Sequence, residues 1–194
     1  FLETVVLHVP GVELLAEARL HPAQDPYLAD HVLDGEAVWP GVFGLEAMAQ
    51  LAGALLARTQ APTFEDVHFL RPVVVPAAGE TIRIAALLCA PDTVELVLRC
   101  AGTGYAVDHY RARCRYGAPA DVRPAPMSLA APTAPALAAD ALYGSGLLFQ
   151  RGRLRRVIGY EQLEACRCRA RLGVDAHEGG WFGRFLPAPL ALGD

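Results

Sequence analysis

The chain has 194 residues, of which 53% are hydrophobic, and it carries a formal net charge of −4 at pH 7. This length and apolar content are enough to bury the core of one domain or of two small ones. The acidic balance excludes the basic footprint of a nucleic-acid-binding protein. The longest apolar helical segment is interrupted by Glu46 and Gln50, which favours a core helix over a membrane span.

The cysteines lie in strand-like runs rather than in a dense disulfide pattern: Cys89, Cys100, Cys114, Cys166 and Cys168. This usage is typical of a reducing compartment. The pair Cys166 and Cys168 lacks a second pair of ligands, which favours strand cysteines over a metal site. No basic region followed by an apolar segment marks a signal peptide near Phe1. We therefore expect a cytoplasmic protein without a bound metal.

The first predicted elements are a strand over Val12–Leu20 and a helix over Gly41–Arg58. Apolar residues recur in the helix at the spacing of one buried face: Leu45, Met48, Ala49, Ala52, Leu55 and Leu56. The opposite face is also small or apolar, so the helix must be enclosed on several sides. A strongly curved sheet wrapped around a single helix would enclose it in this way.

Four strands are predicted after the helix from their alternating apolar residues, namely Phe64–Val75, Thr81–Cys89, Thr93–Cys100 and Tyr105–Tyr116. Turn residues separate the later strands, with Pro91 and Asp92 before the third and Gly102–Gly104 before the fourth. A helix followed by an antiparallel meander is an α+β fold. We assign residues 1–117 to this first unit.

A Pro- and Ala-rich segment follows, and we interpret residues 118–140 as an extended linker. Strand patterning resumes over Leu148–Ile158 and Tyr160–Leu172, where arginines alternate with Cys166, Cys168 and Ala170. The similar alternation at Arg111, Arg113 and Arg115 suggests a duplicated unit. Residues 141–194 are therefore predicted to begin a second unit, which is incomplete because no second core helix follows.

The candidate site is the loop before the helix, where His31, Gly35 and Pro40–Gly41 follow the pattern H-x3-G-x4-P. The pattern places a titratable imidazole about one loop length before a helix start. Free backbone N–H groups and the helix dipole at that end can polarise a carbonyl, while the imidazole accepts a nearby proton. Gly35 would permit a tight turn and Pro40 would set the start of the helix.

These residues resemble a known family. The segment DPYLADHVLDGEAVWPGVFGLEAMAQLAG is similar to the first signature of the dehydratase domains of type I polyketide and fatty-acid synthases, and FEDVHFLRPVVVPAAGETIRIAALL is similar to the strands that follow it. Later, SGLLFQ is a degenerate form of the family motif Y-G-P-x-F-Q, with Ser145 and Leu147 at the Tyr and Pro positions; Tyr143–Gly144 offers a rival alignment. The closing residues WFGRFLPAPLALGD resemble the dehydratases of iterative enediyne-type synthases.

The resemblance implies a double-hotdog fold, a sheet wrapped around a central helix in each unit, here with the second unit incomplete. It implies elimination of water from a β-hydroxyacyl thioester on acyl carrier protein, giving an enoyl thioester in polyketide or antibiotic biosynthesis, without a cofactor. His31 would be the general base and the Gly41 N–H would bind the thioester carbonyl. The family's acid is an Asp in a D-x3-Q/H motif, which neither Asp175 nor Asp194 satisfies, so we expect it beyond Asp194.

The family's partners would be the acyl carrier protein and neighbouring synthase domains, with a homodimer formed through the parent synthase. Two alternatives stay open: a hotdog thioesterase or hydratase acting on acyl-CoA, for which Glu46 is the candidate carboxylate, and a non-catalytic scaffold hotdog. Asp30 and Asp34 flank His31 and could orient it, and Trp39 packs at the helix start or lines the acyl tunnel. We interpret His8 and His21 as structural, whereas His68 and His109 lie in strand patterns and would face either surface of the sheet. The arginine rows are typical of a solvated sheet face, with docking of the acidic phosphopantetheine arm or of the acyl carrier protein as the alternative for one of them.

Overall fold

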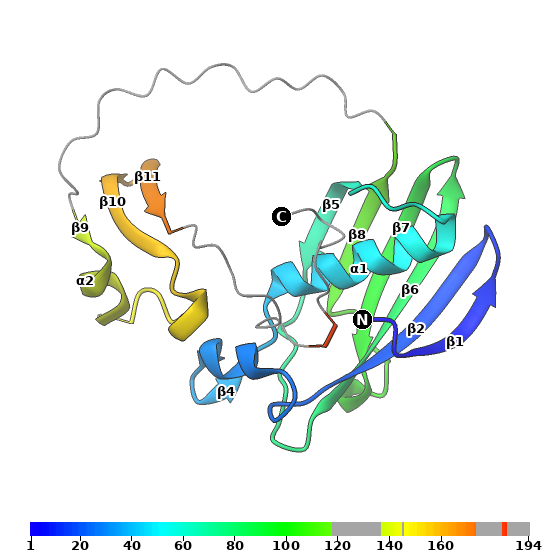
Figure 1. Ribbon diagram of the computed structural model, residues 1–194, viewed down its shortest axis with the longest axis horizontal. Helices are drawn as coiled ribbons and strands as arrows, with labels where there is room; N and C mark the ends of the chain where they lie inside the picture. The colour runs from blue at the N-terminus through cyan, green and yellow to red at the C-terminus, as the bar shows by residue number, and fades with distance from the viewer. Residues whose placement is uncertain (118–136, 145, 174–183, 186–194) are drawn as a thin grey trace.

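A six-stranded antiparallel sheet forms the first part of the chain, in the order β1-β2-β6-β7-β8-β5 (Figure 1). The computed structural model describes residues 1–117, 137–144, 146–173 and 184–185. The strands of this sheet are β1 (Thr4–Val9), β2 (Glu13–Leu20), β5 (Thr63–Phe69), β6 (Glu80–Ala90), β7 (Thr93–Cys100) and β8 (Tyr110–Arg115).

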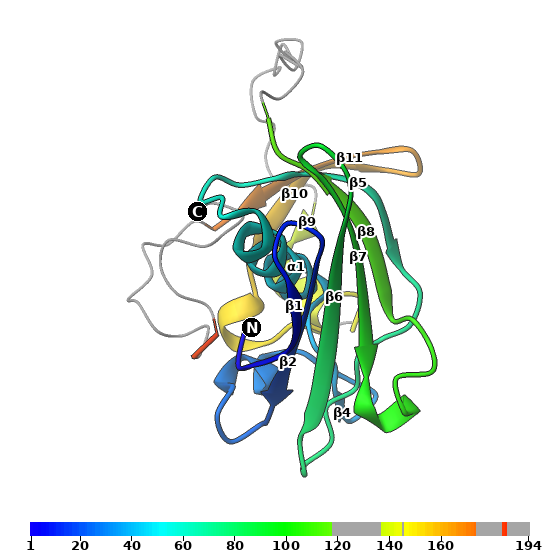
Figure 2. The same cartoon turned by 90° about the vertical axis from the view of Figure 1, so that its right-hand side faces the viewer.

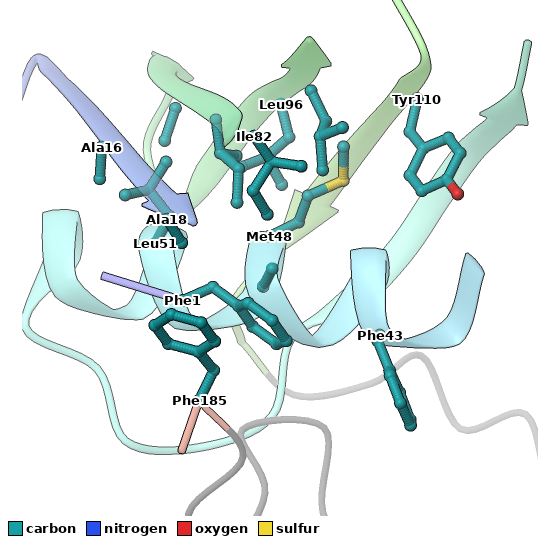
Figure 3. Packing of buried hydrophobic residues seen from close by; sticks show 14 of the residues in the cluster. Phe1, Ala16, Ala18, Phe43, Met48, Leu51, Ile82, Leu96, Tyr110 and Phe185 are labelled. Atoms are coloured by element: carbon teal, nitrogen blue, oxygen red, sulfur yellow. The ribbon is translucent and has the colours of Figure 1, made fainter. Parts of the chain in front are cut away.

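The helix α1 (Gly41–Leu56) lies across one face of this sheet, which curves around it (Figures 1 and 2). Strand side chains alternate, so that one set faces the helix: Leu14, Ala16, Ala18 and Leu20 on β2, and Val94, Leu96, Leu98 and Cys100 on β7. Met48 and Leu51 of the helix pack toward these residues (Figure 3). The expected helix wrapped by an antiparallel sheet is therefore confirmed.

The opposite side of α1 is also covered, because Phe1 and Phe185 stack on each other there with ring centroids 5.1 Å apart (Figure 3). Both rings are almost fully buried. This second cover explains why the helix has so few polar residues. The helix ends at Leu56, two residues before the predicted end, where Ala57 adopts the left-handed conformation and its N–H donates to Gly53 O.

Two predicted strands are shorter than expected. The expected strand Phe64–Val75 is wrong in its second half, because the pairing partner changes after Phe69. The N–H groups of Leu70 and Arg71 donate to the carbonyl of His109, and Val74 then pairs with Val38. The strand expected to begin at Tyr105 begins only at Tyr110, because a 3-10 turn (Ala101–Thr103) and left-handed backbone at Gly104 and Tyr105 precede it.

A smaller three-stranded antiparallel sheet, in the order β11-β10-β9, forms the later part. The strands of this sheet are β9 (Leu137–Ala138), β10 (Val157–Glu164) and β11 (Arg167–Leu172). The helix α2 (Ala139–Gly144) and the 3-10 turn η3 (Gly152–Leu154) lie between β9 and β10 in the chain. The expected strand Leu148–Ile158 is wrong, since most of it is irregular backbone with the 3-10 turn η3, and only Val157 and Ile158 belong to β10. Ile158, Leu163 and Leu172 of the hairpin are exposed. Among the described residues, no helix is long and apolar enough to span a membrane.

Candidate active site

A short β-hairpin carries the residues of the candidate site. It follows the 3-10 turn η1 (Pro26–Asp30) and consists of β3 (Val32–Leu33) and β4 (Glu36–Ala37). The two turn residues, Asp34 and Gly35, have φ of 51° and 85°, as a type I′ turn requires. A side chain at Gly35 would meet nothing within 4 Å, so glycine is favoured there by its backbone freedom and not by space.

His31 lies just before this hairpin and continues its pairing. The N–H of Val38 donates to the carbonyl of His31 at 3.0 Å, and the imidazole Nδ1 of His31 lies 2.6 Å from the carbonyl oxygen of Val38. A carbonyl oxygen can only accept, so the proton of a neutral imidazole must be on Nδ1. The other nitrogen, Nε2, then carries a free lone pair, which is the form that a general base needs.

The start of α1 lies close to His31 along the backbone. Val38 faces His31, and Gly41 is three residues further, so it is at most about 11 Å from Val38 along the chain. Pro40 precedes the helix with φ of −61°, and its carbonyl accepts the N–H groups of Phe43 and Gly44. Gly41 lies before these bonded amides, in the turn where helix N–H groups lack intrahelical partners.

Aromatic rings pack directly against glycines in the first turn of α1. A Cβ added to Gly41 would lie 2.9 Å from the ring of Phe69, and one added to Gly44 would lie 2.5 Å from the ring of Tyr110. Trp39 is almost fully buried, its indole N–H donates to the Tyr27 hydroxyl at 3.3 Å, and its ring is parallel to that of Tyr110. Trp39 thus belongs to the core at the helix start.

A second part of the chain reaches His31. The ring of Phe149 lies edge-to-face with the imidazole, with centroids 4.8 Å apart. A hollow of about 620 Å³ extends beside the Phe149 ring, lined by Val32 and Leu33 of the hairpin and by Phe149 and Arg151 among others. Sequence reasoning did not assign Phe149 to the site; its only signal was the degenerate motif SGLLFQ.

The acidic neighbours of His31 have other partners. The carbonyl of Asp30 accepts the N–H of Arg151 at 2.8 Å, and its carboxylate accepts the N–H of Arg153 at 3.1 Å. Asp34 forms the hairpin turn. The structure therefore places Asp30 in a contact with the later part of the chain, and within the described residues neither aspartate bonds to the imidazole.

Glu46, the carboxylate of the alternative hypothesis, is almost fully buried in α1. The side chain of Gln50 donates to it at 2.9 Å and also to the carbonyl of Phe185. A carboxylate enclosed in this way is not open to a substrate. The aspartates Asp175 and Asp194 lie outside the described residues, so the predicted position of the acid stays a prediction.

His21, His109 and the arginines of β8 have structural surroundings, whereas His8 and His68 are exposed. The Nδ1 of His21 accepts the N–H of Ala23, and burial lowers the pKa of His109. The arginines of β8 pair with carboxylates on the outer face of the sheet: Arg111 with Asp108, Arg113 with Asp66 and Glu95, and Arg115 with Glu65. In the part of the chain that the structure describes, no group of three potential ligands could hold a metal.

Comparison with known proteins identifies the family. The model of the polyketide synthase dehydratase domain matches residues 2–98. Polyketide synthase ThaG of Burkholderia thailandensis is 46% identical over 65 residues, which are 32% of this chain and 1% of that protein.

Solved structures agree with the fold. The dehydratase domain from the CurF module of the curacin synthase superposes with a TM-score of 0.66 at 16% identity, covering 82% of this chain and 60% of that one. The dehydratase domain of PpsC from Mycobacterium tuberculosis gives 0.61 at 20% identity, covering 82% and 57%. The chain thus spans about 60% of the CurF domain and has its hotdog fold. The family match over residues 2–98 shows that the chain belongs to the dehydratase-domain family of polyketide synthases.

Proposed function

We propose that this chain supplies the base-bearing part of a dehydratase that eliminates water from a β-hydroxyacyl thioester. The observation that carries the proposal is the 2.6 Å contact between His31 Nδ1 and the Val38 carbonyl, because it leaves Nε2 unprotonated and available. In the reaction, Nε2 takes the proton from the α-carbon, the C–O bond at the β-carbon breaks, and the carbon–carbon double bond forms.

The negative charge that develops on the thioester oxygen needs a donor during this step. The N–H of Gly41 supports that role, because it lies in the first turn of α1, at the positive end of the helix dipole. The hydroxyl leaves as water only if an acid protonates it. We infer that this acid is an Asp beyond Asp194, supplied by the remainder of a second hotdog unit.

The substrate is proposed to arrive on the phosphopantetheine arm of an acyl carrier protein, without a metal or redox cofactor. Neighbouring synthase domains and a second copy of the parent synthase are the further proposed partners. The edge strand β1 supports a homodimer, since all six of its residues are exposed and most are apolar. The unpaired cysteines among the described residues are consistent with the cytoplasm.

The two alternatives receive less support. A thioesterase or hydratase that relies on a helix carboxylate would need Glu46 open, but it is buried and bonded to Gln50. A scaffold without activity has no need for an imidazole whose Nδ1 is held by a backbone carbonyl. The enediyne assignment rests on residues 181–194, of which the structure describes 184 and 185.

The test is dehydration of a β-hydroxyacyl thioester by a chain extended beyond Asp194. His31→Ala should lower kcat/KM by about 10² or more, the scale of a lost general base. His21→Ala is the matched control, because its ring bonds only locally to the Ala23 N–H and its loss should leave turnover unchanged. The 194-residue chain alone should be inactive. Unchanged turnover in a folded His31→Ala variant would remove His31 from the mechanism.

A further inference from the structure

The residue next to His31 is in unusually close contact with residues that lie about 120 positions later. Asp30 accepts the N–H groups of Arg151 and Arg153, the first through its carbonyl and the second through its carboxylate. Between these two amides, Gly152 has φ of 45°, and a Cβ there would lie 2.2 Å from Asp30 Oδ1. Only glycine lets the two segments approach this closely.

This contact determines where Phe149 lies. Phe149 is two residues before Arg151, whose N–H is bonded to Asp30, so the ring is kept on the same side as His31. The preceding residue is also held, because the Leu148 N–H donates to Leu142 O at 3.3 Å. The Phe149 side chain is half-buried and meets the imidazole edge-to-face.

The imidazole of His31 thus has two restraints. The Val38 carbonyl at Nδ1 selects the tautomer only while the ring stays within bonding distance, and this one bond does not prevent the ring from swinging away from the carbonyl. The Phe149 ring, 4.8 Å away by centroids, contacts the imidazole from another segment and limits this swing. Together they fix both the protonation site and the direction in which Nε2 faces.

We propose that the contact between Asp30 and Gly152 is a positioning device, which holds Phe149 against His31 and thereby aims the basic Nε2 at the substrate. The inference rests on the proposed role of His31 as the general base. Asp30, Phe149 and Gly152 are positioning residues, since they act through His31 and not on the substrate. A site on one hotdog unit is in this way completed by a segment of the other part of the chain.

The expected size of the effect follows from the geometry that a base requires. Catalytic groups must be held within about 0.5 Å of the productive position, and a displacement of about 1 Å can cost about 10² in rate. Phe149→Leu removes the aromatic edge but keeps an apolar side chain, so we expect a loss of about tenfold in kcat with KM little changed. Gly152→Ala displaces the whole contact, and we expect a loss between tenfold and 10².

The test uses nitrogen-15 NMR of the His31 imidazole in the full 194-residue chain, with His31→Gln to assign the signals. The wild-type neutral ring should show the Nδ1–H form, and Phe149→Leu and Gly152→Ala should shift it to a mixture of both tautomers. Gly146→Ala is the matched control, because Gly146 also has positive φ, 78°, but open space around a Cβ. Phe149→Tyr keeps the ring and should restore the wild-type signature.

The same variants are then assayed for dehydration in the chain extended beyond Asp194. Wild-type ring signals in folded Phe149→Leu and Gly152→Ala chains would overturn the positioning role, whatever the activity. If the signals change as expected but even the extended wild-type chain forms no enoyl product, the positioning inference stands and the proposed function fails. A loss of activity in His31→Ala without any in Phe149→Leu and Gly152→Ala would support the base and refute the positioning device.

Discussion

Glycine at position 44 of α1 should be irreplaceable, although alanine is the better helix former. An added Cβ would lie 2.5 and 2.6 Å from two atoms of the Tyr110 ring, about 1 Å closer than ordinary contact. This ring is buried. It is parallel to the ring of Trp39 and lies edge-to-face with the ring of Phe69, with the two ring centroids 5.0 Å apart. Because the ring is buried and lies beside the buried ring of Trp39, it cannot move aside without displacing the helix start.

The magnitude follows from two opposing contributions. Replacing glycine by alanine inside a helix gains about 1 kcal/mol, and overpacking a filled core costs about 1–3 kcal/mol. Gly44→Ala should therefore lower the free energy of unfolding by up to about 2 kcal/mol. Gly41→Ala is the matched control, because its Cβ would meet the half-exposed ring of Phe69, which can swing into solvent. That variant should lose no stability.

Urea denaturation of both variants measures the difference, and hydrogen exchange of the α1 amides shows whether the loss is local. At about 2–4 °C in Tm per kcal/mol for a chain of this size, Gly44→Ala should melt several degrees lower. Adding Tyr110→Leu removes the ring, so the double variant should show a coupling of about 1 kcal/mol or more. A Gly44→Ala chain more stable than wild type would refute the reasoning, since only helix propensity would then be at work.

Two further predictions concern a buried carboxyl and an exposed hairpin. Burial raises the pKa of Asp25, whose Oδ2 accepts the His21 N–H and whose Oδ1 has no partner among the described residues. The fold therefore loses stability as the pH rises above the ordinary carboxyl pKa, and the loss is complete once the pH exceeds the raised pKa. Asp25→Asn should raise the free energy of unfolding at pH 7 by on the order of 1 kcal/mol, measured as a higher midpoint in urea denaturation. The gain should vanish at a pH below the ordinary carboxyl pKa. An equal gain at both pH values would contradict this cause. Exposed Leu163 and Leu172 on β10–β11 should promote assemblies larger than a dimer, so their joint replacement by Ser should reduce such species in sedimentation velocity. Leu147→Ser should not reduce them, although Leu147 is more exposed than either residue, because it lies outside the hairpin.

Local patterns in the sequence predicted most of the first unit. The strand Thr93–Cys100 was predicted with its observed bounds, because turn residues flank a clear alternation. Val73 and Val75 misled the prediction of the strand Phe64–Val75, since both are buried and alternate like strand residues. They pack beside the hairpin instead of continuing β5. Periodicity reports which side chains are buried and cannot report a change of pairing partner.

The candidate site was predictable to the same extent. The spacing of His31, Gly35 and Pro40 drew attention to a loop that the structure shows as a hairpin leading to α1, because a turn and a helix start are local features. The contact of Asp30 with Gly152 could not be predicted, since it joins segments separated by a long stretch of chain and depends on how the two parts dock. The expected strand over Leu148–Ile158 was wrong for the same reason, since only its last two residues, Val157 and Ile158, belong to a strand, β10.

The hairpin before α1 also fixes the number of residues between His31 and the start of the helix. His31 and Val38 face each other because the two-residue turn at Asp34 and Gly35 lies midway between them. One residue inserted into or removed from either arm would turn the following side chains to the opposite face of the hairpin. The imidazole would then lose the Val38 carbonyl, and the helix start would shift by a residue. Surface loops usually accept changes in length, but in this one the number of residues between the imidazole and the helix start determines whether the Val38 carbonyl meets Nδ1.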